Sequence, residues 1–223
     1  MSNVLQPATV LTPAPRRHAL GMPAGSVRAI LALAVLGLLW TVALTHPHGE
    51  TVSEADKHLP TILIALQILM VLVLVHFFTA HGHTIGRHIS GVAPLGLPSG
   101  VIRFVLAVGY IGLSVFLLYN QADFDLPDKN SMWSLLLELV VVLVSYFAGM
   151  LVSACVRMTW GDPPPAPYQD MEAWVAILSL LGLGLVVLIH LINRSVAVEN
   201  RISLDVAQAV LSGLIGLYFG ARS

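Results

Sequence analysis

Charged residues are scarce in this chain and make up only 10% of its 223 residues, whereas an ordinary soluble domain carries roughly 25%. So little charge cannot cover a water-facing surface. Cysteine is nearly absent too, because Cys155 is the only one. A single cysteine excludes an internal disulfide framework and a Cys-x-x-Cys redox site. The sequence therefore predicts neither an ordinary soluble domain nor a disulfide-stabilised one.

Motifs for catalysis and for nucleic-acid binding are also missing. The sequence has no Gly-rich phosphate loop, nucleophile elbow or paired carboxylate motif. Its 11 Lys and Arg residues are too dispersed to form a basic patch. We therefore expect neither an enzyme nor a nucleic-acid partner, and we predict no cofactor.

Long apolar runs are the dominant positive feature, in a chain whose residues are 57% hydrophobic. Each run is near the ~20 residues that a helix needs to cross ~30 Å of hydrocarbon. Backbone polar groups in lipid must bond internally, so runs of this length should be helices. The runs span about 26–45, 60–80, 101–119, 132–156, 172–192 and 204–221. The sequence predicts an all-α, polytopic membrane helix bundle with six transmembrane helices.

Basic residues predict the orientation of the bundle, because Lys and Arg near helix ends are retained on the cytoplasmic side. With the N-terminus inside, seven of the 11 lie on the inner side and four on the outer side. We therefore expect a multi-pass protein of the cell membrane, in a bacterial inner membrane, with both termini cytoplasmic. Residues 1–20 are expected to form a flexible cytoplasmic tail, and residues 21–223 the membrane domain.

One phrase occurs twice: residues 20–33 read LGMPAGSVRAILAL and residues 95–108 read LGLPSGVIRFVLAV, with seven of fourteen positions identical. The ends of the returning helices also repeat at similar spacing. A period of this size is one helical hairpin with its loops. The sequence predicts three hairpin repeats in the same orientation, at about 21–92, 93–166 and 167–223. Arg28 and Arg103, equivalent in the phrase, are interpreted as lipid or topology anchors.

Small residues recur at helical spacing in the fourth and sixth runs. Helix association in lipid depends on close backbone approach, which small side chains allow. The residues that we expect at such helix contacts are Gly149, Ser153, Ser212, Gly216 and Gly220. A pore lining is the alternative interpretation of these stripes.

Polar residues inside the runs are costly in lipid and therefore informative. Gln67, Glu138 and Gln208 are separated by 71 and 70 residues, so three equivalent hairpins would place them in one ring near the outer side. Glu138 is the only acid well inside an apolar run. It should bind a cation, pair with His190, take up a proton or act as a polar bridge between helices.

Histidines cluster in the predicted loops: His46, His48 and His58 fall in the first outer loop, and His81 and His83 in the first inner loop. Imidazole and carboxylate groups can bind zinc or a similar divalent metal. No Cys pair or HExxH spacing accompanies them. A divalent metal site is therefore kept only as an alternative to solvated loop histidines.

The preferred functional hypothesis is a narrow proton or small-cation pathway centred on Glu138. The first alternative is a non-transporting scaffold or assembly subunit, whose stripes of small residues would bind partner helices. A holin-like lesion former is a more distant alternative. The expected partners are the lipid bilayer and either further copies of this chain or other membrane proteins.

Overall fold

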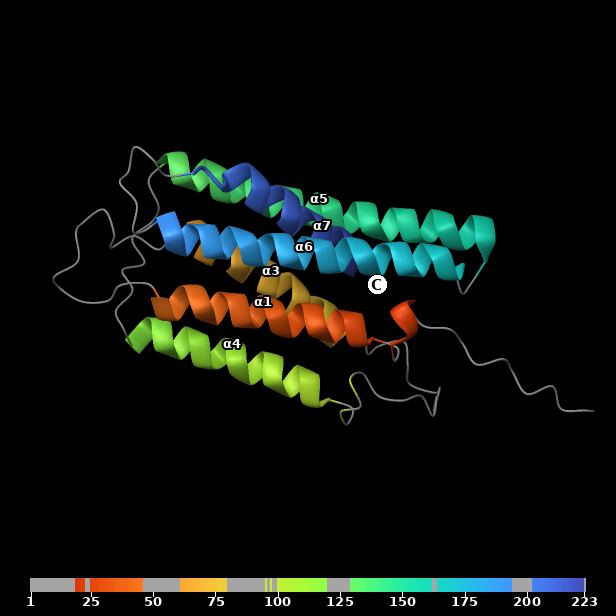
Figure 1. Ribbon diagram of the computed structural model, residues 1–223, viewed down its shortest axis with the longest axis horizontal. Coiled ribbons are helices and arrows are strands. Elements are labelled where there is room, and N and C mark those ends of the chain that lie inside the picture. The colour runs from red at the N-terminus through yellow and green to blue at the C-terminus, as the bar shows by residue number, and fades with distance from the viewer. Residues whose placement is uncertain are drawn as a thin grey trace, which may run out of the picture.

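The computed structural model describes residues 19–22, 25–45, 61–79, 95, 97, 100–119, 129–161, 164–193 and 202–222. Regular structure in these residues is entirely helical (Figure 1). A single 3-10 turn, η1 (Ala19–Gly21), precedes the α-helices. These are α1 (Ser26–Thr45), α3 (Thr61–Thr79), α4 (Val101–Tyr119), α5 (Lys129–Trp160), α6 (Ala166–Asn193) and α7 (Asp205–Ala221). The predicted all-α fold is confirmed.

Five of these helices, α1, α3, α4, α5 and α6, are long and apolar enough to cross a membrane. The sixth, α7, has 17 residues, which is the lower limit of the roughly 17–25 residues that span a bilayer. This helix content is that of a multi-pass membrane protein.

Two helices are longer than their apolar runs. Helix α5 has 32 residues, or about 48 Å at about 1.5 Å per residue, and it continues past the run at both ends. Helix α6 begins at Ala166, six residues before the predicted start, because the N–H groups of Tyr168 and Gln169 already bond to the Pro165 carbonyl oxygen. For α5 and α6 the apolar runs therefore gave the positions of the helices but not their ends.

The helices alternate in direction along one long axis (Figure 1). Helices α1, α4 and α6 begin at one end of the bundle, and α3, α5 and α7 finish there. We call this end the Arg28 end, because Arg28 lies in the first turn of α1. The last residue of α7 lies at the Arg28 end as well, on the same side as the start of α1 (Figure 1).

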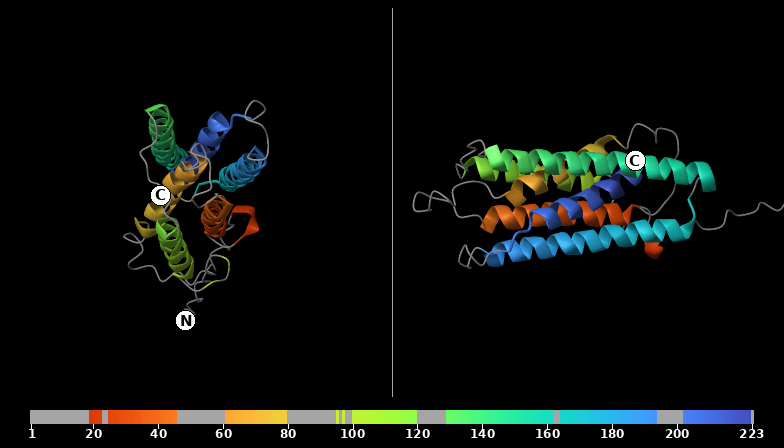
Figure 2. Two further views of the ribbon diagram at one scale, coloured as in Figure 1. Left: turned by 90° about the vertical axis from the view of Figure 1, so that its left-hand side faces the viewer. Right: turned by 90° about the horizontal axis from the view of Figure 1, so that it is seen from above.

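Packing between the helices is uneven. Helices α3, α5 and α7 all contact one another, and α5 with α7 is by far the most extensive pair. Helix α1 packs against α3, α4 and α6, while α4 rests on α1 and α3 (Figure 2). The contact of α4 with α5, its partner in the second predicted hairpin, is marginal at most. The three predicted repeats are therefore not packed alike.

Large apolar side chains cover the outside of the bundle as well as its core. The core includes Leu31, Leu66 and Leu113, which are fully buried. On the outward face of α5, Leu137, Val144 and Leu151 are each more than half exposed. An apolar surface of this extent is unusual for a soluble monomer. It fits contact with lipid chains.

The repeated phrase has matching backbone angles at two pairs of equivalent positions that the structure describes in both copies. Leu20 and Leu95 have φ values of 55° and 57°, and Gly25 and Gly100 have φ values of 83° and 96°. A leucine in the left-handed region is uncommon. In each copy the glycine carbonyl then accepts the first helical hydrogen bond, from Ala29 at 3.0 Å or Phe104 at 2.9 Å. The sequence identity therefore extends to the local fold that starts α1 and α4.

Candidate functional site

The contact between α5 and α7 brings the two helix backbones together at glycine. A Cβ atom added to Gly216 would lie 2.9 Å from the Val142 carbonyl oxygen. Added to Gly220 it would overlap the Tyr146 carbonyl oxygen, and added to Gly149 it would overlap the backbone of α7. Any side chain larger than hydrogen would separate the helices. Close approach through small residues is the usual basis of helix pairing in lipid.

Glu138 lies in this contact and is 3% exposed. Its Oε2 accepts a hydrogen bond from Gln208 Nε2 at 2.8 Å, and its Oε1 accepts one from Ser212 Oγ at 3.3 Å. Gln208 and Ser212 are one turn apart on α7, and both are buried. Both carboxyl oxygens of Glu138 are therefore held by the same face of α7, and we call these three residues the Glu138 site.

The Glu138 site contains no compensating positive charge. Both hydrogen-bond donors are neutral, and among the described residues no ion pair involves Glu138. Asp205, in the first turn of α7, is a second acid on the helix that bonds to the Glu138 carboxyl group. An unpaired carboxylate is expensive in a membrane interior. The site is therefore suited to take up a proton or a small cation.

No hydrogen bond is seen between Glu138 and the remaining members of the predicted polar ring among the described residues. Gln67 is half-buried on α3, and among the described residues it forms no hydrogen bond with Glu138 or Gln208. His190 is half-buried near the last turn of α6, and both hydrogen bonds of the Glu138 carboxyl group come from α7. The structure thus joins two of the ring residues directly.

Most of the other predicted site residues can be placed. Gly149, Gly216 and Gly220 lie in the α5–α7 contact, and Ser153 is buried on α5. Ser212, expected only at a helix contact, also binds the Glu138 carboxyl group. The loop histidines proposed as metal ligands, namely His46, His48, His58, His81 and His83, lie outside the described residues. Within the described residues no group of three His, Cys, Asp or Glu side chains is arranged to hold a metal.

The two arginines of the repeated phrase lie at the starts of different helices, α1 and α4. Arg28 turns toward α3, where its Nη1 lies 3.4 Å from Nε2 of the buried His76. Arg103 is half-buried on α4, which packs on α1 and α3. The same position in two copies of the phrase therefore serves different places in the bundle.

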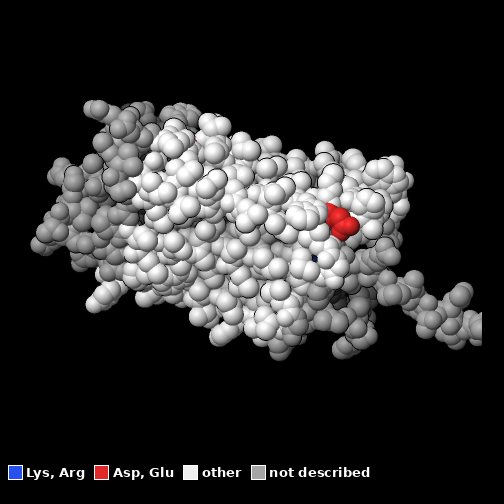
Figure 3. Space-filling model, in the orientation of Figure 1, with Lys and Arg blue, Asp and Glu red and all other residues white. Residues whose placement is uncertain are grey.

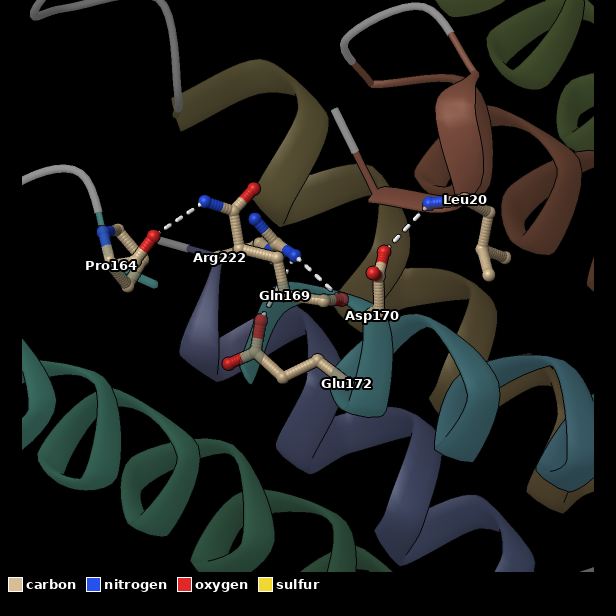
Figure 4. Close-up of polar contacts among 6 residues, drawn as sticks. All are labelled: Leu20, Pro164, Gln169, Asp170, Glu172 and Arg222. Atoms are coloured by element: carbon tan, nitrogen blue, oxygen red, sulfur yellow. Dashed lines mark hydrogen bonds and ion pairs between the residues drawn. The ribbon is translucent and has the colours of Figure 1, made fainter. Parts of the chain in front are cut away.

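A second polar group lies at the Arg28 end, where Glu172 of α6 meets Arg222 beyond α7 (Figure 4). Sequence reasoning did not find this pair. The two residues are 50 positions apart, and each stands at the edge of an apolar run. No local spacing connects them, so only the three-dimensional fold reveals the contact.

Comparison with known protein families, with curated proteins and with solved structures finds no match to this chain.

Proposed function

We propose that this multi-pass membrane protein provides a narrow pathway for protons or small cations and that Glu138 carries the ion. The observation behind the proposal is the Glu138 site itself, a carboxyl group 3% exposed whose two bonding partners are both neutral. The protein would lie in a bacterial inner membrane with both termini in the cytoplasm. In that orientation the Glu138 site lies toward the outer side.

A purely structural role for Glu138 is the main competing explanation. A polar bridge between α5 and α7 needs a hydrogen-bond acceptor, which the amide oxygen of glutamine or asparagine also supplies. A carboxyl group differs from an amide chiefly because it can exchange a proton and carry charge. Since a buried carboxyl group in lipid costs more than an amide, its presence favours a function that uses the proton or the charge.

The scaffold alternative depended on stripes of small residues free to bind partner helices. Two glycines of α7, Gly216 and Gly220, are instead covered by the backbone of α5 within the same chain. Large apolar side chains occupy the outward faces of α4 and α5, which fits lipid at those faces. The geometry therefore favours the pathway over the scaffold.

The course of the pathway is suggested by α7. The first half of α7 carries the polar side chains of Gln208 and Ser212. The next polar group is Tyr218, six residues or about 9 Å beyond Ser212. Between them the buried side chain of Ile215 faces the core. An ion that reaches Glu138 from the side where α7 begins would have to pass this apolar side chain.

The test is ion flux into liposomes that contain the purified protein, followed with an internal pH-sensitive dye under an imposed gradient. Flux should be present for the wild-type chain and absent for Glu138→Gln, which keeps size and hydrogen bonding. Glu199→Gln, an acid of the last predicted outer loop, is the matched control and should conduct normally. Equal flux in Glu138→Gln and the wild type, or no wild-type flux above empty liposomes, would refute the proposal.

A further inference from the structure

Four helices meet in a polar group at the Arg28 end that is distinct from the Glu138 site. Its members are Arg28 of α1, His76 of α3, Glu172 of α6, Tyr218 of α7 and Arg222 just beyond α7. We call it the arginine cluster. It accounts for part of the little charge that the described surface carries: on the face in Figure 3, charged atoms appear only near the start of α6.

Arg222 fastens the end of α7 to the start of α6. Its Nη2 lies 3.0 Å from Glu172 Oε2 and also donates to the Gln169 carbonyl oxygen at 3.5 Å (Figure 4). The guanidinium lies over the Tyr218 ring, 5.9 Å from its centre. The Gln169 side chain in turn donates to the Pro164 carbonyl oxygen at 2.7 Å. The Arg222 side chain is therefore fixed in place.

Two buried polar atoms of the cluster nevertheless have no hydrogen-bond partner, namely Glu172 Oε1 and Arg222 Nε. The Glu172 side chain is only 7% exposed, so bulk water does not replace the missing bond. Buried polar groups in native proteins are almost always bonded. Glu172 Oε1 lacks a donor, and Arg222 Nε lacks an acceptor. A bound group that supplies both a donor and an acceptor would satisfy the two atoms.

Arg28 adds a positive charge that forms no ion pair with a carboxylate among the described residues. Its Nη1 contacts His76 Nε2, and because a guanidinium only donates, that imidazole nitrogen accepts the bond and carries no proton. Tyr218 and Arg222 both lie near enough to act electrostatically on Arg28, and Arg222 carries a like charge. The single carboxylate of the cluster, Glu172, is engaged by Arg222. An anion near the two arginines would relieve this imbalance.

We propose that the arginine cluster binds a phosphate group that carries a hydrogen-bond donor of its own. Guanidinium groups match the oxygens of a phosphate, and several oxygens let one phosphate reach both Arg28 and Arg222 Nε. The attached donor, an ammonium or a hydroxyl, would satisfy Glu172 Oε1. Phospholipid headgroups combine these features, and so do small water-soluble phosphates. The proposal does not depend on ion conduction at Glu138.

Arg103 provides a matched control because it occupies the position of Arg28 in the second copy of the phrase. It lies on α4, which packs on α1 and α3 and shares no substantial contact with α7. The Arg103→Gln substitution removes an equal charge from the same position in the first turn of a helix. It leaves the arginine cluster intact.

The experiment measures the phospholipid that stays bound after the full-length protein is extracted in mild detergent and washed extensively, by native mass spectrometry. Wild type and Arg103→Gln should retain phospholipid, and Arg28→Gln should retain about tenfold less, because a charge-assisted pair is lost. Circular dichroism checks that each variant folds. Should Arg28→Gln not fold, Arg28→Lys replaces it, since lysine keeps the charge and loses the planar fork.

A second arm distinguishes the source of the phosphate. If the phosphate comes from water, washed protein retains no lipid, and inorganic phosphate raises the melting temperature of the wild type and Arg103→Gln but not that of Arg28→Gln. The proposal is overturned if Arg28 and Arg103 variants behave alike in both arms. It is also overturned if the wild type neither retains phospholipid nor responds to inorganic phosphate.

Discussion

Gln208 Nε2 donates a hydrogen bond to Glu138 Oε2 across 2.8 Å, and this bond joins residues 70 positions apart in the chain. It lies inside a helix contact so close that glycine is required on both sides. Backbone proximity and the buried carboxyl group therefore belong to one structural unit. A substitution in the helix contact should therefore affect the buried carboxyl group measurably, and the reverse should hold as well.

The first prediction concerns the stability of the Glu138 site. Glu138→Leu removes the costly carboxyl group but leaves Gln208 and Ser212 without their acceptor, which costs about 1–3 kcal/mol for a buried donor. In Glu138→Leu/Gln208→Leu both partners of the shorter bond are apolar, and the Ser212 hydroxyl can bond to a carbonyl of its own helix. The double variant should therefore be as stable as the wild type or more stable, while any flux is lost. Unfolding in denaturing detergent measures the stability of both variants, and the liposome assay measures their flux. A double variant that does not fold would show that Glu138 is structural.

The second prediction concerns the glycines of α7. Gly220→Ala forces a methyl group onto the Tyr146 carbonyl oxygen and should destabilise the fold by about 1–3 kcal/mol through overpacking. Gly184→Ala in α6 is the control, because no atom lies within 4 Å of its added Cβ. Alanine there should be neutral or stabilise the helix by up to about 1 kcal/mol. Equal effects at both positions would contradict the close α5–α7 contact.

The third prediction concerns the link between α6 and the end of α7. Arg222→Gln leaves the buried Glu172 carboxylate unpaired and should cost about 1–3 kcal/mol, less than a fully buried pair because the Arg222 side chain is 23% exposed. Glu172→Gln should cost a similar amount. A double-mutant cycle should show the two costs to be less than additive. Strict additivity would mean that the ion pair does not form.

The fourth prediction concerns orientation. In a Cys155→Ser background, which removes the exposed native thiol, single cysteines at positions 50, 125 and 197 should react with an impermeant reagent applied outside the cell. Cysteines at positions 90, 165 and 223 should react only after the membrane is opened. One reversed loop would require a new assignment of the helices.

Composition and apolar runs were sufficient to predict the helical fold, and α1 and α4 begin and end where their runs do. The longer ends of α5 and α6 were missed because a helix continues through polar residues once its backbone bonds are established. The spacing of residues in the chain also predicted that Glu138 and Gln208 lie close together. The same spacing placed Gln67 in the ring, and this part stays a prediction, because the three repeats are not packed alike and equal spacing need not give equal contacts.

The partners that spacing could not reveal are those set by tertiary packing alone. Ser212 was assigned to helix packing, because a serine in a small-residue stripe has no sequence feature that marks it as a carboxylate ligand. Arg28 and Arg103 share a motif and differ only in the helices around them. Local sequence therefore predicted which residues are costly to bury, and the fold determined what each one contacts.

The most direct measurement is ion flux through Glu138→Gln compared with the exchanged variant Glu138→Gln/Gln208→Glu in liposomes. The exchange moves the carboxyl group across the same 2.8 Å contact and preserves both the number of acids and the hydrogen-bonded pair. Flux should disappear in the single variant and return in the exchanged one, because the site again holds an ionisable group. Undiminished flux in Glu138→Gln would contradict the account.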